Sequence, residues 1–297
     1  MDYCILKSIS DAILMKNTLE AIKVLNALTD WIEPIYGYQE ARSIALMILE
    51  RKFGFSRDKI LSGRQVSISI PDVIPLNDIL SRLCKNEPIQ YILGEAFFYD
   101  RWFRINPSVL IPRPETEELC RMILEENRSP MNKILDIGTG SGCIAITLAL
   151  QMDQAEVYGW DISEPAIRVA EENARLYQAR VKFSILDIVS YRGPGPLADI
   201  VVCNPPYVTD KEAALMNKNV LDHEPREALF SGDDPLKFHK SVMSLKKILL
   251  KSGGRIYFEI NESSGDDARV LFSEHGMKEI RIVRDIHGKN RFACGGL

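Results

Sequence analysis

The chain lacks the features that place a protein in a membrane or direct it out of the cell. Its 297 residues contain no uncharged apolar run of about 18 residues, the length that a membrane-spanning helix needs. The segment Met1 to Ser10 has an acid before its one lysine and no long apolar core, so it does not read as a secretory signal. We therefore expect a cytoplasmic protein without membrane contact.

Cysteine and histidine are few and scattered along the chain. The six cysteines form no Cys-x-x-Cys pair, and none of the four histidines stands at ligand spacing from a cysteine. In a chain of this length, such a pattern is typical of reduced thiols rather than of a disulfide framework. For the same reason we expect no structural metal.

An excess of basic residues is also missing, since the formal net charge is −4. Proteins that grip duplex DNA usually carry a basic footprint, because the release of counterions drives that binding. We therefore expect no direct nucleic-acid partner, although a local basic patch would be compatible with this composition. The length fits two domains, and we expect a monomer.

Residues 1–88 have the pattern of a helical domain. Apolar residues recur at helical spacing from Ile5 to Leu28 and again from Tyr38 to Lys52. Pro75 can occupy the first turn of a last helix that runs from Leu76 to Asn86. We expect a helical bundle that serves substrate recognition.

Residues 89–114 have a different character and are expected to link two domains. Aromatic β-formers are dense between Phe97 and Phe103, and Asp100-Arg101 can form a turn between them, which predicts a short β-hairpin. An apolar helix should follow from Glu117 to Glu126, capped by Thr116 or by the turn before it.

Strands and helices alternate through residues 115–297. This alternation predicts an α/β domain with a mostly parallel, doubly wound sheet, in which ligands bind outside the carboxyl ends of the strands. The expected strands are Lys133–Ile137, Glu156–Trp160, Val181–Leu186, Ile200–Cys203, Arg255–Ile260, Lys278–Arg284 and Arg291–Cys294. The expected helices are Gly142–Gln151, Pro165–Tyr177, Leu236–Leu250 and Ala268–His275.

A glycine-rich loop follows the first of these strands and opens a helix. Its residues after Asp136 and Ile137 are Gly138, Thr139, Gly140, Ser141 and Gly142. Glycines let the backbone turn sharply and approach a ligand closely. Asp161 ends the next strand, where an acid can accept hydrogen bonds from ribose hydroxyls. The spacing Gly-x-Gly-x-Gly differs from the dinucleotide fingerprint, so these residues predict a nucleoside ligand.

Two residues after the third strand are candidates for the same ligand. Asp187 stands where an acid can receive the amino group of an adenine, although it could equally cap a turn. Ile188 can pack on the face of the adenine or belong to the core.

Asn204-Pro205-Pro206-Tyr207 follows the fourth strand and predicts methyl transfer to a planar nitrogen. The lone pair of an amide or aminopyrimidine nitrogen is delocalised, so the nitrogen is a poor nucleophile. Acceptors on the Asn204 side chain and the Pro205 backbone can orient its NH2 group and stabilise the positive charge that develops. The prolines remove competing N–H donors, and Tyr207 can stack on the planar group. Attack on a sulfonium methyl then needs mainly proximity and orientation.

These motifs resemble the release-factor glutamine N5-methyltransferases, the HemK/PrmC family, over nearly the whole chain. The N-terminal 80 or so residues match only in helical character. Residues 110–117, Leu-Ile-Pro-Arg-Pro-Glu-Thr-Glu, are a more specific match than a glycine loop. The other matching segments are 88–95, 136–142, Asp161, 204–207, 223–229 and 288–291.

The resemblance implies a class I S-adenosylmethionine methyltransferase domain behind a helical domain and a hairpin. It implies that the substrate is the glutamine of the Gly-Gly-Gln loop of bacterial class I peptide-chain release factors, an event of translation termination. Residues 138–142 and Asp161 would then hold the cofactor, and Asn204 would contact both cofactor and substrate. Pro205, Pro206 and Tyr207 would complete the glutamine site. Some family members have an aromatic residue in place of Ile188.

Two other methyltransferases share the Asn-Pro-Pro-Tyr motif and stay open as alternatives. One methylates a glutamine of a ribosomal protein, and only the N-terminal domain would distinguish it. The other methylates adenine N6 in nucleic acid and would have to flip its base, which the acidic charge balance disfavours. A non-catalytic binding protein is a third alternative, against which the intact Asn204 argues. Residues 221–234, rich in Pro, Gly and charge, are expected to form a mobile cover over the site.

Overall fold

The computed structural model describes residues 19–66, 70–128 and 133–297. Contacts divide the chain into two units, the first ending at Leu93 and the second beginning at Gly94. Of the helical pattern expected from Ile5 to Leu28, the part up to residue 18 lies outside the described residues.

The first unit is helical, as predicted. The apolar spacing between Ala41 and Leu49 predicts one buried face of a helix. In α3 that face is buried. The expectation that Pro75 starts the last long helix was wrong, because that helix begins at Ile70 and Pro71 takes the first-turn position that suits proline. The elements are β1 (Leu19–Glu20), α2 (Ala21–Tyr36), α3 (Tyr38–Arg51), α4 (Arg57–Leu61), β2 (Gln65–Val66), α5 (Ile70–Leu83) and α6 (Ile89–Leu93).

The second unit is built on a seven-stranded sheet with the order β12-β13-β11-β8-β5-β6-β7. The five strands from β11 to β7 are parallel, and β13 pairs antiparallel with both β11 and β12. This confirms the predicted α/β fold with a mostly parallel sheet. The strands are β5 (Lys133–Ile137), β6 (Glu156–Asp161), β7 (Val181–Ile185), β8 (Ala198–Cys203), β11 (Leu250–Glu259), β12 (Lys278–Arg284) and β13 (Asn290–Gly296).

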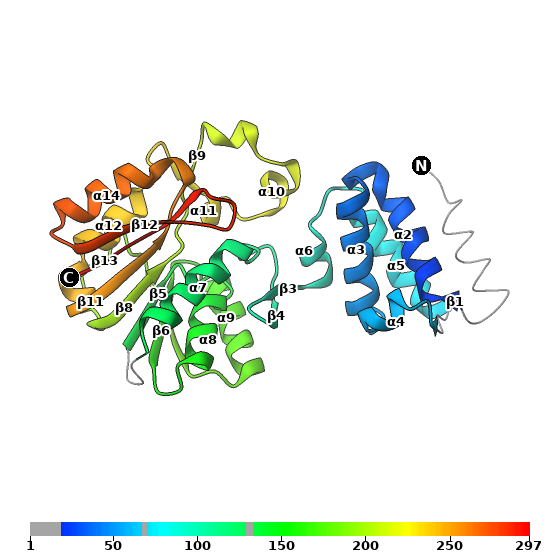
Figure 1. The fold of residues 1–297 in the computed structure, drawn as a ribbon, viewed down its shortest axis with the longest axis horizontal. Helices are drawn as coiled ribbons and strands as arrows, with labels where there is room; N and C mark the ends of the chain where they lie inside the picture. Colours follow the sequence, from blue (N-terminus) through cyan, green and yellow to red (C-terminus); the bar gives the residue numbers. More distant parts are fainter. Residues whose placement is uncertain (1–18, 67–69, 129–132) are drawn as a thin grey trace. The chain divides into compact units, whose positions relative to one another are not determined.

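Helices cover both faces of the sheet. Alternate strand residues point to opposite sides, so each face contributes apolar side chains to its own cluster. Ile134 and Ile200 belong to one apolar cluster, whereas their neighbours Leu135 and Val201 belong to another. Figure 1 shows α7, α8 and α9 on one side of the sheet and α12 and α14 on the other. The bounds of these helices are α7 (Pro114–Glu126), α8 (Cys143–Gln151), α9 (Glu164–Tyr177), α12 (Lys237–Ser244) and α14 (Gly265–Glu274).

The predicted helix Leu236–Leu250 is wrong as a single element. It is divided into α12 and the short α13 (Lys246–Leu249), and β11 begins at Leu250. Leu245, between the helices, has φ −95° and ψ 0°, which is not helical. The break lets the chain turn into the sheet, and Gly253 with φ +77° allows the register shift before Arg255.

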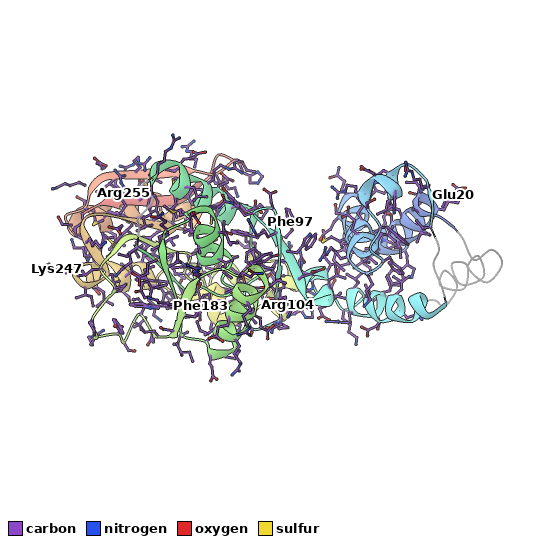
Figure 2. The ribbon with its side chains drawn as sticks, turned by 90° about the horizontal axis from the view of Figure 1, so that it is seen from below. Glu20, Phe97, Arg104, Phe183, Lys247 and Arg255 are labelled. Atoms are coloured by element: carbon purple, nitrogen blue, oxygen red, sulfur yellow. The ribbon has the colours of Figure 1, made fainter. Side chains whose placement is uncertain are left out.

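The hairpin lies in the second unit and consists of β3 (Glu95–Phe98) and β4 (Arg101–Arg104). Figure 2 labels Phe97 and Arg104 on it. Its turn is Tyr99-Asp100, with φ of 47° and 61°, rather than the expected Asp100-Arg101. A right-handed strand twist favours two-residue turns in which both residues have positive φ, and this shifts the turn by one position.

Short elements connect the last strands. They are β9 (Val208–Thr209), η1 (Glu212–Leu215), α10 (Lys218–His223), α11 (Arg226–Leu229), β10 (Phe230–Gly232) and η2 (Glu262–Ser264). Within residues 19–66, 70–128 and 133–297, no helix has both the length and the apolar character needed to cross a membrane. The same residues contain no group of three His, Cys, Asp or Glu side chains placed to hold a metal ion.

Candidate active site

A cavity opens at the carboxyl ends of β5, β6 and β8. The chain runs from β5 outward through β6 and β7 and then returns to β8 on the other side of β5. Such a reversal leaves a crevice where ligands bind in doubly wound sheets. The cavity encloses about 1100 Å³, open solvent at its mouth included. Of the predicted residues, its lining contains Gly138, Thr139, Gly140, Ser141, Asp161, Asp187, Ile188, Asn204, Pro205 and Pro206.

The glycine loop is held against the end of β6 by its own backbone. The N–H groups of Gly138 and Thr139 donate to the Trp160 carbonyl at 2.8 and 3.0 Å, and the Gly140 N–H donates to Asp161 Oδ2 at 2.9 Å. Gly138 and Gly140 have φ of +74° and +54°, a region that suits glycine. No atom lies within 4 Å of where a Gly140 side chain would begin, so the loop leaves open space on the cavity side.

Gly142 is the predicted cofactor residue that does not line the cavity. It precedes α8 with φ +79°, and an added Cβ would lie 3.0 Å from Ile146 Cδ1 and 3.1 Å from Ala170 Cβ. Its position therefore lets α8 and α9 approach each other closely. A direct contact between Gly142 and a ligand stays a prediction.

Gly142→Ala should lower the free energy of unfolding by about 2–4 kcal/mol, because left-handed strain and crowding add. Gly140→Ala is the matched control. It has the same kind of backbone strain but no neighbour within 4 Å, so about 1–2 kcal/mol is expected. Urea unfolding monitored by circular dichroism measures both. Equal losses would contradict the packing role of Gly142.

Asp161 has the position and the partners of a hydrogen-bond acceptor for a ligand. Its Oδ1 accepts from the Ser163 N–H at 2.9 Å, and its Oδ2 accepts from Gly140. Burial raises the pKa of this carboxyl above its ordinary value, and the backbone donors oppose that shift. Two backbone amides thus fix the carboxylate and leave further lone pairs for a diol at the cavity wall.

Asp187 and Ile188 follow β7 and line the same cavity. Asp187 Oδ1 accepts from the Val189 N–H at 2.9 Å, as in a turn. Burial would raise the Asp187 pKa, but hydrogen bonds from Ser190 and the backbone outweigh it and lower the pKa. Ile188 is 9% exposed and belongs to an apolar cluster. Asp187 can therefore be a turn residue or a ligand contact, and Ile188 can be a core residue or a ligand contact.

Asn204 stands directly after β8, beside the glycine loop. The backbone carbonyl oxygen of Asn204 lies 3.7 Å from where a Gly138 Cβ would be. The Asn204 side chain donates from Nδ2 to Thr116 Oγ1 at 3.2 Å, and Thr116 donates to Glu259 Oε2 at 2.8 Å. The segment after β8 therefore meets the start of α7 and the end of β11 at this point.

Tyr207 does not line the cavity. Its hydroxyl donates to Glu259 Oε1 at 3.0 Å. Burial, followed by the nearby charge of Glu259, raises its pKa well above the ordinary value, so the hydroxyl keeps its proton. The expected stacking of the Tyr207 ring on a planar substrate group stays a prediction.

The sequence did not single out Thr116, which lines the cavity, or Glu259, which accepts hydrogen bonds from Thr116 and Tyr207. We expected Thr116 to cap a helix from Glu117, but α7 begins at Pro114 with Arg113 at its N-cap. Proline suits the first helical position because it has no N–H to leave unpaired, and this places Thr116 inside the first turn. Glu259 ends an apolar strand, the same signal that identified Asp161, and could have been found in that way.

The predicted cover, residues 221–234, is joined to the segment before α7. Glu224 is buried, and its Oε1 accepts from Arg113 Nη2 at 2.6 Å while its Oε2 accepts from the Ile111 N–H at 3.3 Å. Glu227 and Ala228 line the cavity. This segment therefore forms part of the cavity wall, and its mobility stays a prediction.

Comparison with known proteins identifies both parts of the chain. Residues 116–264 match the model of the methyltransferase small domain, and residues 34–94 match that of the PrmC N-terminal domain. A release factor glutamine methyltransferase of Bacteroides thetaiotaomicron is 42% identical over 90% of this chain and 98% of its own. The protein of the same name from Bacillus subtilis is 35% identical over 94% of this chain and 98% of its own.

The fold also resembles that of a solved structure. The hMettl16 catalytic domain, in complex with the MAT2A 3'UTR hairpin 6, aligns with a TM-score of 0.52 at 14% identity, over 80% of this chain and 84% of that one. At this identity the likeness concerns the fold alone. The two relatives, in contrast, cover at least 90% of this chain at 42% and 35% identity, and the chain belongs to the family of release factor glutamine methyltransferases.

Proposed function

We propose that this protein transfers a methyl group from S-adenosylmethionine to the side-chain nitrogen of the glutamine in the Gly-Gly-Gln loop of class I peptide-chain release factors. The observation that carries the proposal is Asn204. Asn204 lines the cavity at the end of β8, beside the glycine loop, and its side-chain NH2 group donates to Thr116. Family membership supports the choice of a glutamine as the acceptor.

The residues present fit the cofactor. When bound, S-adenosylmethionine supplies a sulfonium methyl that is open to nucleophilic attack. No atom lies within 4 Å of where a Gly140 Cβ would be, so the loop leaves open space there, where a side chain would obstruct a ligand. The Asp161 carboxylate would accept hydrogen bonds from the ribose hydroxyls. Asp187 would receive the adenine amino group, and Ile188 would pack on the apolar face of the ring.

The chain's own residues would bind and orient the glutamine amide. Asn204 Oδ1 and the Pro205 carbonyl would accept hydrogen bonds from its NH2 group, which directs the nitrogen and stabilises the charge that develops on it. Pro206 and Tyr207 would complete the wall of the glutamine site. The methylated nitrogen becomes acidic once it is cationic, so its proton can pass to water without a strong general base.

The remaining assignments follow from this function. Residues 1–88 would recognise the release factor, and residues 115–297 would carry out the methyl transfer. Residues 89–114 would link these two domains. The net charge of −4 supports a protein substrate over nucleic acid. We infer a monomer that acts in the cytoplasm, where release factors meet the ribosome.

Labelled S-adenosylmethionine and three acceptors test the function directly. The acceptors are a release factor, a ribosomal protein and an oligonucleotide, and we expect label in the release factor only. A release factor with Gln→Ala in its Gly-Gly-Gln loop should take up no label. Label in the oligonucleotide alone would refute a protein substrate, and label that persists after Gln→Ala would refute the assigned glutamine.

A further inference from the structure

We propose that Thr116 and Glu259 are positioning residues that determine which end of the Asn204 amide faces the substrate. The inference rests on the proposed function, in which Asn204 contributes an acceptor to the substrate NH2 group. An asparagine side chain has a carbonyl oxygen and an NH2 group of nearly the same shape. Only one of its two orientations offers the acceptor, so the site needs a means of selecting it.

Three elements that are distant in the sequence supply this means. Thr116 lies in the first turn of α7, Asn204 follows β8, and Glu259 ends β11. Thr116 Oγ1 is 2.8 Å from Glu259 Oε2 and 3.2 Å from Asn204 Nδ2. The threonine hydroxyl therefore stands between a carboxyl group and the amide.

The direction of the hydrogen bonds follows from the number of protons. A hydroxyl has one proton to donate, and an ionised carboxylate can only accept. When Thr116 gives its proton to Glu259, its oxygen can only accept from the other side. Asn204 must then present its NH2 group to Thr116, which leaves Oδ1 for the substrate.

The opposite orientation of Asn204 would be costly at this place. It would bring Oδ1 against an oxygen whose only proton is already used. If Thr116 turned its proton to Asn204 instead, the Glu259 carboxylate would lose a donor. Thr116 and Glu259 are 2% and 1% exposed, so water cannot replace the lost bond, and an unsatisfied buried charged group is expensive.

The surroundings of Glu259 favour its role as an acceptor. Its Oε1 accepts from the Tyr207 hydroxyl at 3.0 Å. Burial raises the pKa of Glu259 above its ordinary value, and the hydroxyls of Thr116 and Tyr207 together with the charge of Arg291 oppose that shift. His239 Nε2 is 2.8 Å from the Glu259 backbone oxygen. Burial lowers the His239 pKa to about 4, so the ring is neutral and donates from Nε2. This bond holds the end of β11 against α12.

Two substitutions at Thr116 separate the hydroxyl from the shape of the side chain. Thr116→Val keeps the shape and removes the hydroxyl, whereas Thr116→Ser keeps the hydroxyl and removes a methyl group. We expect Thr116→Val to lower kcat about tenfold or more, the usual effect of losing one buried hydrogen bond. Thr116→Ser should stay within about threefold of wild type. The affinity for S-adenosylmethionine and the melting temperature of both variants are measured alongside.

Glu259→Gln is a second, nearly isosteric test that does not alter Thr116. Its amide can donate to Thr116, which frees the threonine proton for Asn204 and permits the unproductive orientation. We expect a loss of kcat similar to that of Thr116→Val. The double variant should lose little more than either single variant, because both act through the same amide.

A purely structural role predicts instead that kcat falls only in parallel with the melting temperature, because Thr116→Val also leaves the buried Glu259 carboxylate without a donor. The inference is refuted if Thr116→Val retains wild-type kcat, if Ser and Val variants are impaired equally, or if Thr116→Val still lowers the residual rate in an Asn204→Ala background. If Thr116→Val does not fold, Thr116→Ser and Glu259→Gln decide. If the wild type methylates another acceptor, the proposed function fails, and the same Ser-over-Val order is measured with that acceptor.

Discussion

Asn204→Ala is expected to lower kcat for methylation of the release factor by about 10²–10³-fold, the usual effect of removing one preorganised polar group that stabilises developing charge. The substituted side chain removes an acceptor for the substrate NH2 group and leaves Thr116 without its donor. Steady-state kinetics with labelled S-adenosylmethionine measure the loss. The KM for the release factor should change far less than kcat, because the proposed function assigns recognition of the release factor to residues 1–88.

Two controls distinguish lost chemistry from lost structure. The melting temperature of Asn204→Ala should stay close to that of wild type, because Asn204 is only partly buried. A release factor with Gln→Ala in the Gly-Gly-Gln loop should give no label with either enzyme. Unchanged kcat in Asn204→Ala would show that the proposed mechanism is wrong.

Asp161→Asn is expected to weaken binding of S-adenosylmethionine by about 10–100-fold, because hydrogen bonds to a charged group contribute about 1.5–3 kcal/mol. Each Asp161 oxygen also accepts from a backbone N–H, one from Ser163 and one from Gly140. An asparagine NH2 group would face one of these donors and displace the side chain or the loop. Isothermal titration calorimetry with S-adenosylmethionine measures the change.

Asp187→Asn is the matched control for this effect. Asp187 also lines the cavity and also accepts from a backbone N–H two residues later. Its proposed partner is a single adenine amino group rather than a ribose diol, so a smaller loss is expected. If Asp161→Asn bound S-adenosylmethionine as tightly as wild type, Asp161 would not hold the ribose.

Local patterns predicted the parts of the site that depend on strand ends. The glycine loop and Asn204 follow parallel strands and Asp161 ends one, and the carboxyl ends of such strands meet at one edge of the sheet. Their convergence on one cavity could therefore be predicted without coordinates. The division of the helix after Leu236 could not, because the apolar spacing continues across the break at Leu245.

Tertiary packing decided what several of these residues contact. Gly142 matches a cofactor motif, but its missing side chain makes room for Ile146 and Ala170. The ring of Tyr207 is expected to stack on the planar substrate group, and its hydroxyl donates to Glu259. The approach of Ala170 to Gly142 and of Glu259 to Tyr207 does not follow from residue type or spacing, because these partners come from elements whose approach is set by the packing of the whole domain.

The sequence by itself determined the α/β fold, the edge of the sheet that carries the site, and the family through motifs such as residues 110–117. Only the tertiary structure decided how Asn204 is oriented. Its partner Thr116 lies 88 residues away, and Thr116 in turn lies 143 residues from Glu259. Hydrogen bonds over such separations produce no periodic pattern in the sequence. They depend on how α7, β8 and β11 pack, because that packing brings the three side chains within hydrogen-bond distance.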